Sequence, residues 1–578
     1  MSGKKISTLP KAGGDLLVEC LVNEHVKYLF GIPGGHILGI YDAVYRWGRE
    51  KGIDTIMVRH EQAGAHAADA YARATGEIGV CFGTVGPGVL DMVPGVGAAW
   101  ADNIPLLVLG GQIKRMLDGK SSLQGDLDQI TLMKPITKAQ FQIQKAEEIP
   151  EIISRAIRLA LTGRKGPVYI DIRQDALDEE ITEDMSYEIV PAQKSRPQEK
   201  IATDQTLISE AVELLKDAKK PIIICGAEVT AFEASEEARL LSEKFSIPAG
   251  SSVAGIGTVA GDMTTHLGAS IASDTLLNAA MYSDLVVSIG ARWNWTLGFG
   301  MAPLWSKEQK LIQINIDPAE IGKNRTVDVA IIGDSKTVLK QLIKEMEETL
   351  PKEKIEEWAQ WNQEQQDYKQ MQMKRNLRKM NSDKEPILPQ RFIKEIFEFF
   401  PEDGIVIADG GDVCVYALEQ VDLHKPTKPR QVLFPVNMGH LGVGIPYAIG
   451  AKLAFPKKQV GVLAGDGSFL FNIQELETAV RYNLPIVVVV GNNSCWGMIK
   501  TCQSVSYKKR FIDVDLPDIN LANIAKGFGC YAERVTKHED IKPALQRAVE
   551  SNKPAVIEVV IKFDMPKGTK VMANLGLL

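Results

Sequence analysis

The sequence has few cysteines, and none of them are arranged in pairs. Its seven cysteines are an odd number, and no two of them form a C-x-x-C motif. This argues against a disulfide framework and against a thiolate zinc site, both of which need cysteines at characteristic spacings. Free thiols are typical of a reducing compartment, so we expect a cytoplasmic protein. The cysteines are Cys20, Cys81, Cys225, Cys414, Cys495, Cys502 and Cys530.

Long apolar runs and basic clusters are also lacking. No run approaches the roughly 18 apolar residues of a membrane span. The N-terminal residues MSGKKISTLPKAGGD are polar where a signal peptide would be apolar. Lys+Arg 66 against Asp+Glu 73 gives a net charge of -7, without basic residues interleaved with aromatics. We therefore expect no nucleic-acid or membrane surface, and small molecules and other copies of the chain as partners.

What is present is a repeated alternation of short apolar, β-branched runs with longer segments of helical spacing. At 578 residues the chain is too long for one core, and the alternation predicts an α/β fold of three doubly wound parallel-sheet domains. A polar segment interrupted by prolines, residues 186–205, marks a first domain boundary, which we call the first seam. A second seam at 351–387 predicts a long surface helix and linker whose Met and Trp side chains form a packed face. The predicted domains are residues 1–185, 206–350 and 388–578.

A repeated sequence pattern relates the first and third predicted domains. Residues 101–111 (ADNIPLLVLGG) and 481–493 (RYNLPIVVVVGNN) share an Asn-apolar-Pro pattern followed by an apolar strand and glycine. Each lies about a helix downstream of a glycine-flanked strand end, GPG at 86–88 and GDG at 465–467. We predict that these two domains are related folds, with the middle domain inserted between them.

The most specific motif lies in residues 465–493, where Asn493 follows Asp466 by 27 residues. A strand that ends at Asp466, a crossing helix and a strand that ends at Asn493 would place both side chains at one carboxyl edge of the sheet. The Asp466 carboxylate, the Asn493 amide oxygen and the Cys495 carbonyl are predicted to hold Mg²⁺ together with phosphate oxygens and water. The glycines would let the backbone approach a diphosphate, and a helix after Ser468 would offer its N–H groups. Alone, each half is an ordinary turn or loop, but the pair at this spacing is similar to the thiamine-diphosphate fingerprint.

Glu61 opens an alanine-rich helix in residues 58–76 (VRHEQAGAHAADAYARATG). In most chains such a residue is only a helix-start carboxylate favoured by the helix dipole. Beside the metal motif a second role is favoured, because thiamine needs a carboxylic acid against N1′ of its aminopyrimidine. A buried glutamate with a raised pKa suits that role. For the flanking His60 and His66 we predict structural roles.

These motifs together resemble the acetolactate synthase superfamily of thiamine-diphosphate enzymes over nearly the whole chain and in the same order. The resemblance implies an N-terminal pyrimidine-binding domain with the catalytic glutamate, a Rossmann-like middle domain and a C-terminal diphosphate-binding domain with the metal motif. It also implies a cofactor gripped by two subunits, hence at least a homodimer and commonly a homotetramer. The matching segments are RHEQ at 59–62, GIPGG at 31–35, GPG at 86–88, the metal motif and IDPAEIGKN at 316–324.

The resemblance also implies a set of cofactor-binding residues. Residues 435–446 (PVNMGHLGVGIP) resemble the stretch whose backbone binds the aminopyrimidine edge. Its bulky apolar residue, Leu441, would wedge the cofactor into a V shape. The full set is Gly35, Glu61, Asp412, Gly439, Leu441, Asp466, Gly467, Ser468, Asn493, Cys495, Trp496, Gly497 and Met498.

Three segments differ from acetolactate synthases where the substrate is chosen. His36 stands where those enzymes usually carry alanine, residues 121–138 replace their Phe-Gln-Glu segment, and Cys502 replaces the tryptophan of their C-terminal substrate loop. Instead, GGHI at 34–37, LQGDLDQ at 123–129 and NNSCWG at 492–497 are similar to benzaldehyde lyase. That resemblance implies that His36 and Gln124 move protons on the substrate oxygen, although a packed or surface histidine is the ordinary alternative for His36.

The middle domain carries two further indications. IGARWNW at 289–295 resembles 2-hydroxyacyl-CoA lyases and oxalyl-CoA decarboxylases, but the tyrosine and glutamate that those decarboxylases add to the LQGD loop are absent. An oxalyl substrate is therefore not expected, while a CoA thioester stays open. Residues 266–274 lack the Gly-His-Gly stretch of flavin-carrying synthases, so FAD is not expected either. An ADP-type nucleotide stays open from the fold alone.

We therefore predict a thiamine-diphosphate-dependent lyase or carboligase that acts on 2-hydroxy carbonyl or 2-oxo compounds, with 2-hydroxyacyl-CoA thioesters among the candidates. The alternative within the same class is condensation of two 2-oxoacids of the acetolactate synthase type. An alternative of another class is a catalytically silent nucleotide-binding protein. An intact Glu61 together with an intact metal pair argues against a silent protein.

Overall fold

The computed structural model describes residues 11–196, 200–574 and 576. The polar N-terminal residues 1–10 and residues 197–199 of the first seam lie outside the described residues. The chain divides into two compact units. Among the described residues, no helix combines the length and apolar character needed to span a bilayer. Unit 1 comprises Met1–Gln198 and Pro446–Ala454, and unit 2 comprises Glu199–Ile445 and Phe455–Leu578.

Unit 1 is built on a six-stranded sheet of order β2-β1-β3-β4-β6-β5, in which every pairing is parallel. The four inner strands of the sheet are almost entirely buried, as expected for a covered parallel sheet, whereas the two edge strands are partly exposed. The strands are β1 (Tyr28–Gly31), β2 (Asp54–Met57), β3 (Gly79–Gly83), β4 (Leu106–Gln112), β5 (Gln140–Ile143) and β6 (Val168–Arg173).

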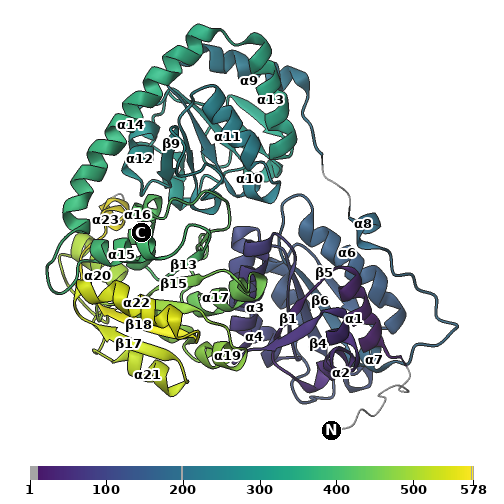
Figure 1. Ribbon diagram of the computed structural model, residues 1–578. Helices are drawn as coiled ribbons and strands as arrows, with labels where there is room; N and C mark the ends of the chain where they lie inside the picture. The colour runs from purple at the N-terminus through teal and green to yellow at the C-terminus, as the bar shows by residue number, and fades with distance from the viewer. Residues whose placement is uncertain (1–10, 197–199, 575, 577–578) are drawn as a thin grey trace. The chain divides into compact units, whose positions relative to one another are not determined.

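Helices cover both faces of this sheet (Figure 1). One face packs against α1, α2 and α6, and α3 and α4 pack together on strands β1, β3 and β4. Residues 446–454 of α17 also belong to unit 1, although the sequence places them in the predicted third domain. The helices are α1 (Gly13–Asn23), α2 (Leu38–Arg46), α3 (Glu61–Thr75), α4 (Pro87–Asp102), α5 (Gln129–Met133), α6 (Ile149–Leu161), α7 (Gln174–Asp178), α8 (Ala192–Ser195) and α17 (Gly444–Ala454).

Unit 2 contains two further parallel six-stranded sheets. The middle sheet has the order β12-β11-β10-β7-β8-β9, which is the 3-2-1-4-5-6 order of a Rossmann-like domain and confirms that prediction. The strands are β7 (Pro221–Cys225), β8 (Ala249–Ser251), β9 (His266–Ala269), β10 (Leu285–Ile289), β11 (Lys310–Asn315) and β12 (Val329–Ile332). The helices are α9 (Gln205–Asp217), α10 (Ala227–Ala231), α11 (Ser235–Lys244), α12 (Asp274–Tyr282) and α13 (Ser335–Thr349).

The C-terminal sheet has the order β14-β13-β15-β16-β18-β17. Counted in chain order, this is the order of the unit 1 sheet, so the predicted relation between the first and third domains is confirmed. The strands are β13 (Ile405–Asp409), β14 (Val432–Leu433), β15 (Val460–Gly465), β16 (Val487–Asn492), β17 (Tyr531–Val535) and β18 (Ala555–Val560). The helices are α15 (Pro389–Phe399), α16 (Asp412–Gln420), α18 (Asp466–Phe469), α19 (Glu475–Arg481), α20 (Gly497–Ser506), α21 (Leu521–Gly527), α22 (Ile541–Glu550) and α23 (Lys567–Asn574).

The second seam forms the predicted long helix, α14 (Lys352–Met380). Its buried Trp358 and Trp361 donate to the carbonyls of Ala218 and Pro221 at 3.0 and 3.2 Å, so the tryptophans form the predicted packed face, whereas Met371, which was expected there too, is 55% exposed. The three sheets fall within the three predicted residue ranges.

Short 3₁₀ helices connect many of these elements. They are η1 (Gly35–Ile37), η2 (Gly48–Lys51), η3 (Arg115–Leu117), η4 (Lys134–Ile136), η5 (Ala146–Glu148), η6 (Val253–Gly255), η7 (Trp295–Gly300), η8 (Pro318–Glu320), η9 (Val421–Leu423), η10 (Leu470–Asn472) and η11 (His538–Asp540).

Candidate functional site

In unit 1, Glu61 is the first residue of α3 and is half-buried. The preceding residue, His60, caps the helix, because its side chain accepts a hydrogen bond from the Gln62 N–H at 3.2 Å. Burial raises the pKa of the Glu61 carboxyl above its ordinary value, and the charge of Asp91 adds to this effect. Glu61 therefore keeps its proton to higher pH than an exposed glutamate, which suits a group that donates a hydrogen bond.

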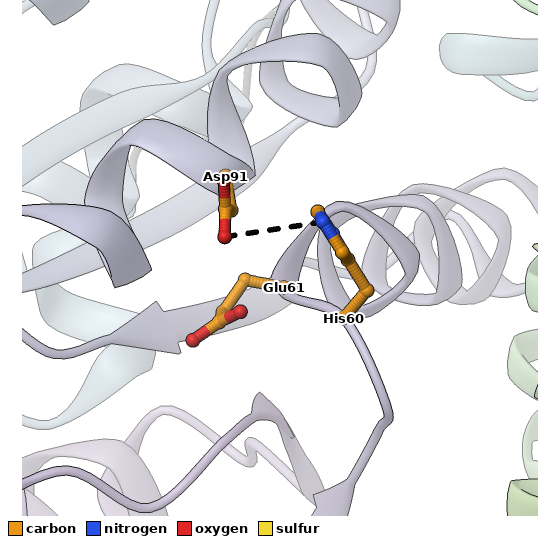
Figure 2. Close-up of side chains that lie close together, drawn as sticks. All are labelled: His60, Glu61 and Asp91. Carbon is orange, nitrogen blue, oxygen red and sulfur yellow. Dashed lines mark ion pairs between the residues drawn. The ribbon is translucent and has the colours of Figure 1, made fainter.

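A small cluster of polar side chains surrounds this glutamate (Figure 2). The His60 Nε2 lies 3.9 Å from the Asp91 Oδ2, and Glu61 lies beside this pair. One ligand-type atom from each of the three residues falls within 4.8 Å of the others. Asp91 comes from α4 and belongs to none of the predicted motifs, so only the packing of α3 against α4 brings it to Glu61.

His36 and Gln124 both lie beside one turn in unit 1. The half-buried His36 places its Nδ1 3.1 Å from the Thr84 Oγ1, and burial lowers the pKa of its imidazole. Gln124 is exposed with φ +64°, and its carbonyl oxygen lies against Gly86, where an added Cβ would come within 2.8 Å of it. The structure thus places both predicted substrate residues beside the turn at residues 84–86. Gly35 is exposed, with open space where a side chain would be.

The predicted residues of the C-terminal region line one cavity of about 450 Å³ in unit 2. The cavity lies at the carboxyl ends of the C-terminal strands, where ligands generally bind in open α/β sheets. Its lining is mostly apolar and glycine-rich, with the carboxylates of Asp412 and Asp466 among its few charged groups. The predicted residues on its wall are Asp412, Gly439, Leu441, Asp466, Gly467, Ser468, Asn493, Cys495, Trp496, Gly497 and Met498.

The residues of the predicted metal site fit a divalent cation. Strands β15 and β16 are paired with Gly465 opposite Gly491, so Asp466 and Asn493 follow neighbouring strand ends. The Asp466 Oδ1 accepts from the Gly467 N–H at 2.9 Å, whereas its buried Oδ2 has no hydrogen-bond partner among the described residues. Burial raises the pKa of Asp466 to about 6. A buried carboxylate oxygen without a donor is the kind of atom that a cation satisfies.

Comparison with known proteins identifies the family. Residues 11–132 match the N-terminal TPP binding domain of thiamine pyrophosphate enzymes, 208–342 match the central domain, and 409–559 match the C-terminal TPP binding domain. The "Probable acetolactate synthase large subunit" of Methanocaldococcus jannaschii is 36% identical over 95% of this chain and 92% of its own length. The protein of the same name from Methanococcus aeolicus is 35% identical over 95% and 92%. The "Acetolactate synthase large subunit" of Buchnera aphidicola subsp. Schizaphis graminum is 33% identical over 93% and 92%.

The chain belongs to the acetolactate synthase superfamily of thiamine-diphosphate-dependent enzymes. Thiamine diphosphate is therefore its cofactor, and the chain is an enzyme of the lyase and transferase type. The family places the unit 1 cluster around Glu61 in a TPP-binding domain and the unit 2 cavity in the other TPP-binding domain.

In this thiamine-diphosphate enzyme, the helix predicted after Ser468 begins two residues earlier, at Asp466, and is broken into α18, η10 and α19. The break coincides with Asn472, whose buried side chain donates to the Gly442 carbonyl at 2.8 Å and leaves the regular helical pattern. Gly467 also has a more specific role than predicted, because a Cβ there would lie 2.6 Å from the Trp496 ring. The glycine allows Trp496 to pack against the strand end.

Two buried carboxyls in the cavity region differ in their hydrogen bonds. Asp409, at the end of β13, accepts from the N–H groups of Gly442 and Gly444 at 3.0 and 2.9 Å and so anchors the loop that carries Leu441. Asp409 belongs to none of the predicted motifs, although an acidic residue at a strand end before Gly-Gly is a recognisable signal. Burial raises the pKa of Asp412 to about 7, and its Oδ2 has no partner in the described part of the chain. A protonated Asp412 could donate to a phosphate oxygen.

The middle-domain motif at residues 289–295 braces the same loop. The Trp295 Nε1 donates to the Val436 carbonyl at 3.1 Å, and Asn294 donates to the Asn437 Oδ1 at 2.6 Å. Trp295 also lines the cavity, which the motif alone did not indicate. His66 is fully buried with its ring at the edge of Tyr447, in agreement with a structural role.

Proposed function

We propose that this enzyme condenses two 2-oxoacids in the manner of acetolactate synthases, with Mg²⁺ and thiamine diphosphate as cofactors. The observation that carries the proposal is the 36% identity to a relative with that name over 95% of this chain and 92% of the relative. The sequence motifs had favoured a lyase or carboligase acting on 2-hydroxy carbonyl compounds or CoA thioesters, with this condensation as the alternative. The names of the relatives support the alternative.

Each residue of the proposed site has a task that its surroundings support. Thiamine diphosphate supplies a nucleophilic ring carbon and an electron sink beside the substrate carbonyl. Glu61 keeps a proton at N1′ of the aminopyrimidine, in line with its raised pKa. Asp466, Asn493 and the Cys495 carbonyl would hold Mg²⁺, which would neutralise charge on the diphosphate. Leu441, on the loop anchored by Asp409, shapes the cofactor.

His36 and Gln124 are proposed to orient the substrate oxygen and exchange its proton. Burial lowers the pKa of the His36 imidazole, so the neutral ring is favoured near physiological pH and can accept a proton. The contact of His36 with Thr84 and that of the Gln124 backbone with Gly86 place both beside one turn. This arrangement is the observation that favours the second candidate, acyloin cleavage or ligation like that of benzaldehyde lyase.

A product assay separates the two candidates. The purified enzyme, with thiamine diphosphate and Mg²⁺, is incubated with pyruvate, with a benzoin-type acyloin and with a 2-hydroxyacyl-CoA, and the products are identified by NMR. Formation of acetolactate from pyruvate supports the first proposal. Cleavage of the acyloin or the thioester without any condensation of pyruvate would overturn it and favour the lyase. Titration calorimetry with thiamine diphosphate and Mg²⁺ tests the silent-protein alternative, which predicts no binding.

Two further expectations accompany the proposal. We propose at least a homodimer, and commonly a homotetramer, because the family resemblance implies a cofactor shared between two subunits; light scattering measures this. An ADP-type nucleotide in the middle domain is supported only by the Rossmann-like strand order. Calorimetry with ADP tests it, and a lack of heat with intact enzyme would remove it.

A further inference from the structure

His60 does more than cap α3. Its Nδ1 accepts the Gln62 N–H, and this hydrogen bond assigns the neutral ring tautomer in which Nε2 carries the proton. The Nε2 lies 3.9 Å from the Asp91 Oδ2 (Figure 2). The cap therefore points an N–H group toward the Asp91 carboxylate.

Asp91 approaches Glu61 from a different helix. It is the fifth residue of α4, which packs along α3, and its side chain is 43% exposed. Glu61 is the more enclosed carboxyl of the two, being held at the start of α3. Two carboxyls this close disfavour double ionisation, and the more enclosed one retains the proton.

A metal site is the other interpretation of this cluster. Within the described ranges, His60, Glu61 and Asp91 are the one group of three such side chains whose ligand atoms come within 4.8 Å of one another. A metal at the His60 Nε2 would need the lone pair that the tautomer replaces with a proton. Binding would then require loss of the hydrogen bond from Gln62 that caps α3. The geometry thus favours a proton-holding cluster.

We propose that Asp91, oriented by His60, is a positioning residue whose negative charge keeps the Glu61 carboxyl in the proton-bearing form that donates to the cofactor. The proposal rests on the proposed role of Glu61. Burial raises the pKa of the Glu61 carboxyl most, and the charge of Asp91 from α4 raises it further. His60 from the cap of α3 would lower that pKa only as a protonated ring, and the hydrogen bond from the Gln62 N–H to its Nδ1 disfavours that form. A glutamate alone at this helix start would be closer to ordinary acidity.

Asp91→Asn tests the charge with little change of shape. The measurement is deuterium exchange at C2 of the bound cofactor, followed in the holoenzyme as a function of pH. We expect the exchange rate at neutral pH to fall roughly three- to tenfold. The alkaline limb of the profile should move to lower pH, because Glu61 loses its proton sooner. Cofactor affinity should stay within about twofold of wild type.

Two variants serve as controls. Asp91→Glu keeps the charge and should retain a profile close to wild type. Asp42→Asn removes one negative charge from α2, where Asp42 pairs with Arg46, and should leave the profile unchanged. Added salt tests the same charge in the wild-type enzyme, and this test does not depend on whether a variant folds. It should move the wild-type profile in the direction of Asp91→Asn, because an exposed charge is screened.

Other results would overturn the proposal. A wild-type profile in Asp91→Asn that is also insensitive to salt would show that the charge has no influence on Glu61. An equal loss of exchange at every pH, shared by Asp91→Glu and accompanied by weaker cofactor binding, would show a purely structural role. If Glu61→Gln itself leaves exchange unchanged, the proposed function of Glu61 fails, and this result is distinct from a failure of Asp91 alone.

Discussion

The first and third sheets have the same strand order, yet the acidic side chains near their strand ends are held in different ways. In unit 1, Glu61 is half-buried and is accompanied by Asp91, whose side chain is 43% exposed. In unit 2, Asp409 and Asp466 are only 1% and 7% exposed, and burial raises the pKa of each to about 6. One topology thus carries a half-buried carboxyl near one sheet and almost fully buried carboxyls at the strand ends of the other. The difference comes from the side chains at the strand ends and not from the fold.

The largest expected effect comes from removing a buried carboxylate in unit 2. Asp466→Ala removes the buried carboxylate and should weaken binding of thiamine diphosphate by more than about a hundredfold with Mg²⁺ present, because the metal carries the diphosphate. Calorimetry measures the affinity. Asp540→Ala removes an acidic residue from η11 of the same unit and should bind normally. Wild-type affinity in Asp466→Ala would show that the metal lies elsewhere.

On the unit 1 side, Glu61→Gln should separate binding from activation. The variant keeps the shape of the side chain and should fold and bind Mg²⁺ normally. Exchange at C2 of the cofactor should slow by roughly two or more powers of ten, the scale of a lost acid–base partner. NMR detection of deuterium uptake checks this. An unchanged rate would remove Glu61 from cofactor activation.

His36→Ala sharpens the comparison within unit 1, since it should affect the substrate and not the cofactor. We expect thiamine diphosphate binding and C2 exchange to persist, and ligation or cleavage of the preferred substrate to fall roughly a hundredfold. Steady-state turnover and C2 exchange, measured on the same preparation, test this pair of outcomes. Full turnover would mean that the contact with Thr84 is a packing contact only.

The parts of the site that the sequence predicted are those whose residues share a motif. Asp466, Asn493 and Glu61 follow strand ends at recognisable spacings, and the strands follow from apolar runs. The sequence could not predict Asp91, because this residue meets Glu61 only where α3 packs against α4. Trp295 is a similar case, since its Nε1 reaches the Val436 carbonyl across 141 residues of the chain, through a tertiary contact within unit 2. Side chains that meet through tertiary packing leave no periodic signal in the chain.

The two units also hold buried charge in opposite ways. In unit 1, Arg73 pairs with two aspartates, whereas in unit 2 Asp422 lies between His266 at 3.1 Å and Lys369 at 3.4 Å. Burial alone would raise the pKa of Asp422, but the charges of His266 and Lys369 outweigh it and hold that pKa below its ordinary range. A lowered pKa contributes stability above the unfolded value of about 4 and loses it as the pH falls further.

Asp422→Asn should therefore destabilise unit 2 by about 1–3 kcal/mol at neutral pH. It should also weaken the loss of stability on acidification, since the titrating group is gone. Urea unfolding at a series of pH values measures both effects. An acid limb identical to wild type would show that Asp422 makes no net contribution to acid sensitivity.

The smallest effect tests whether α17 belongs energetically to unit 1. The Tyr447 hydroxyl donates to the buried Asp69 Oδ2 at 2.7 Å, and Arg73 donates to the other oxygen at 2.6 Å. Tyr447→Phe removes one hydrogen bond to a charged acceptor that keeps its arginine, so we expect the free energy of unfolding to fall by about 1–2 kcal/mol. Hydrogen exchange should become faster in α17 and α3 and stay unchanged in β15 and β16.

The matched control is Tyr416→Phe in unit 2, because the buried Tyr416 hydroxyl has no hydrogen-bond partner among the residues described. Removing that hydroxyl should be neutral or slightly stabilising. Equal losses in both variants would mean that the contact with Asp69 contributes nothing specific and that α17 is held by its apolar packing alone.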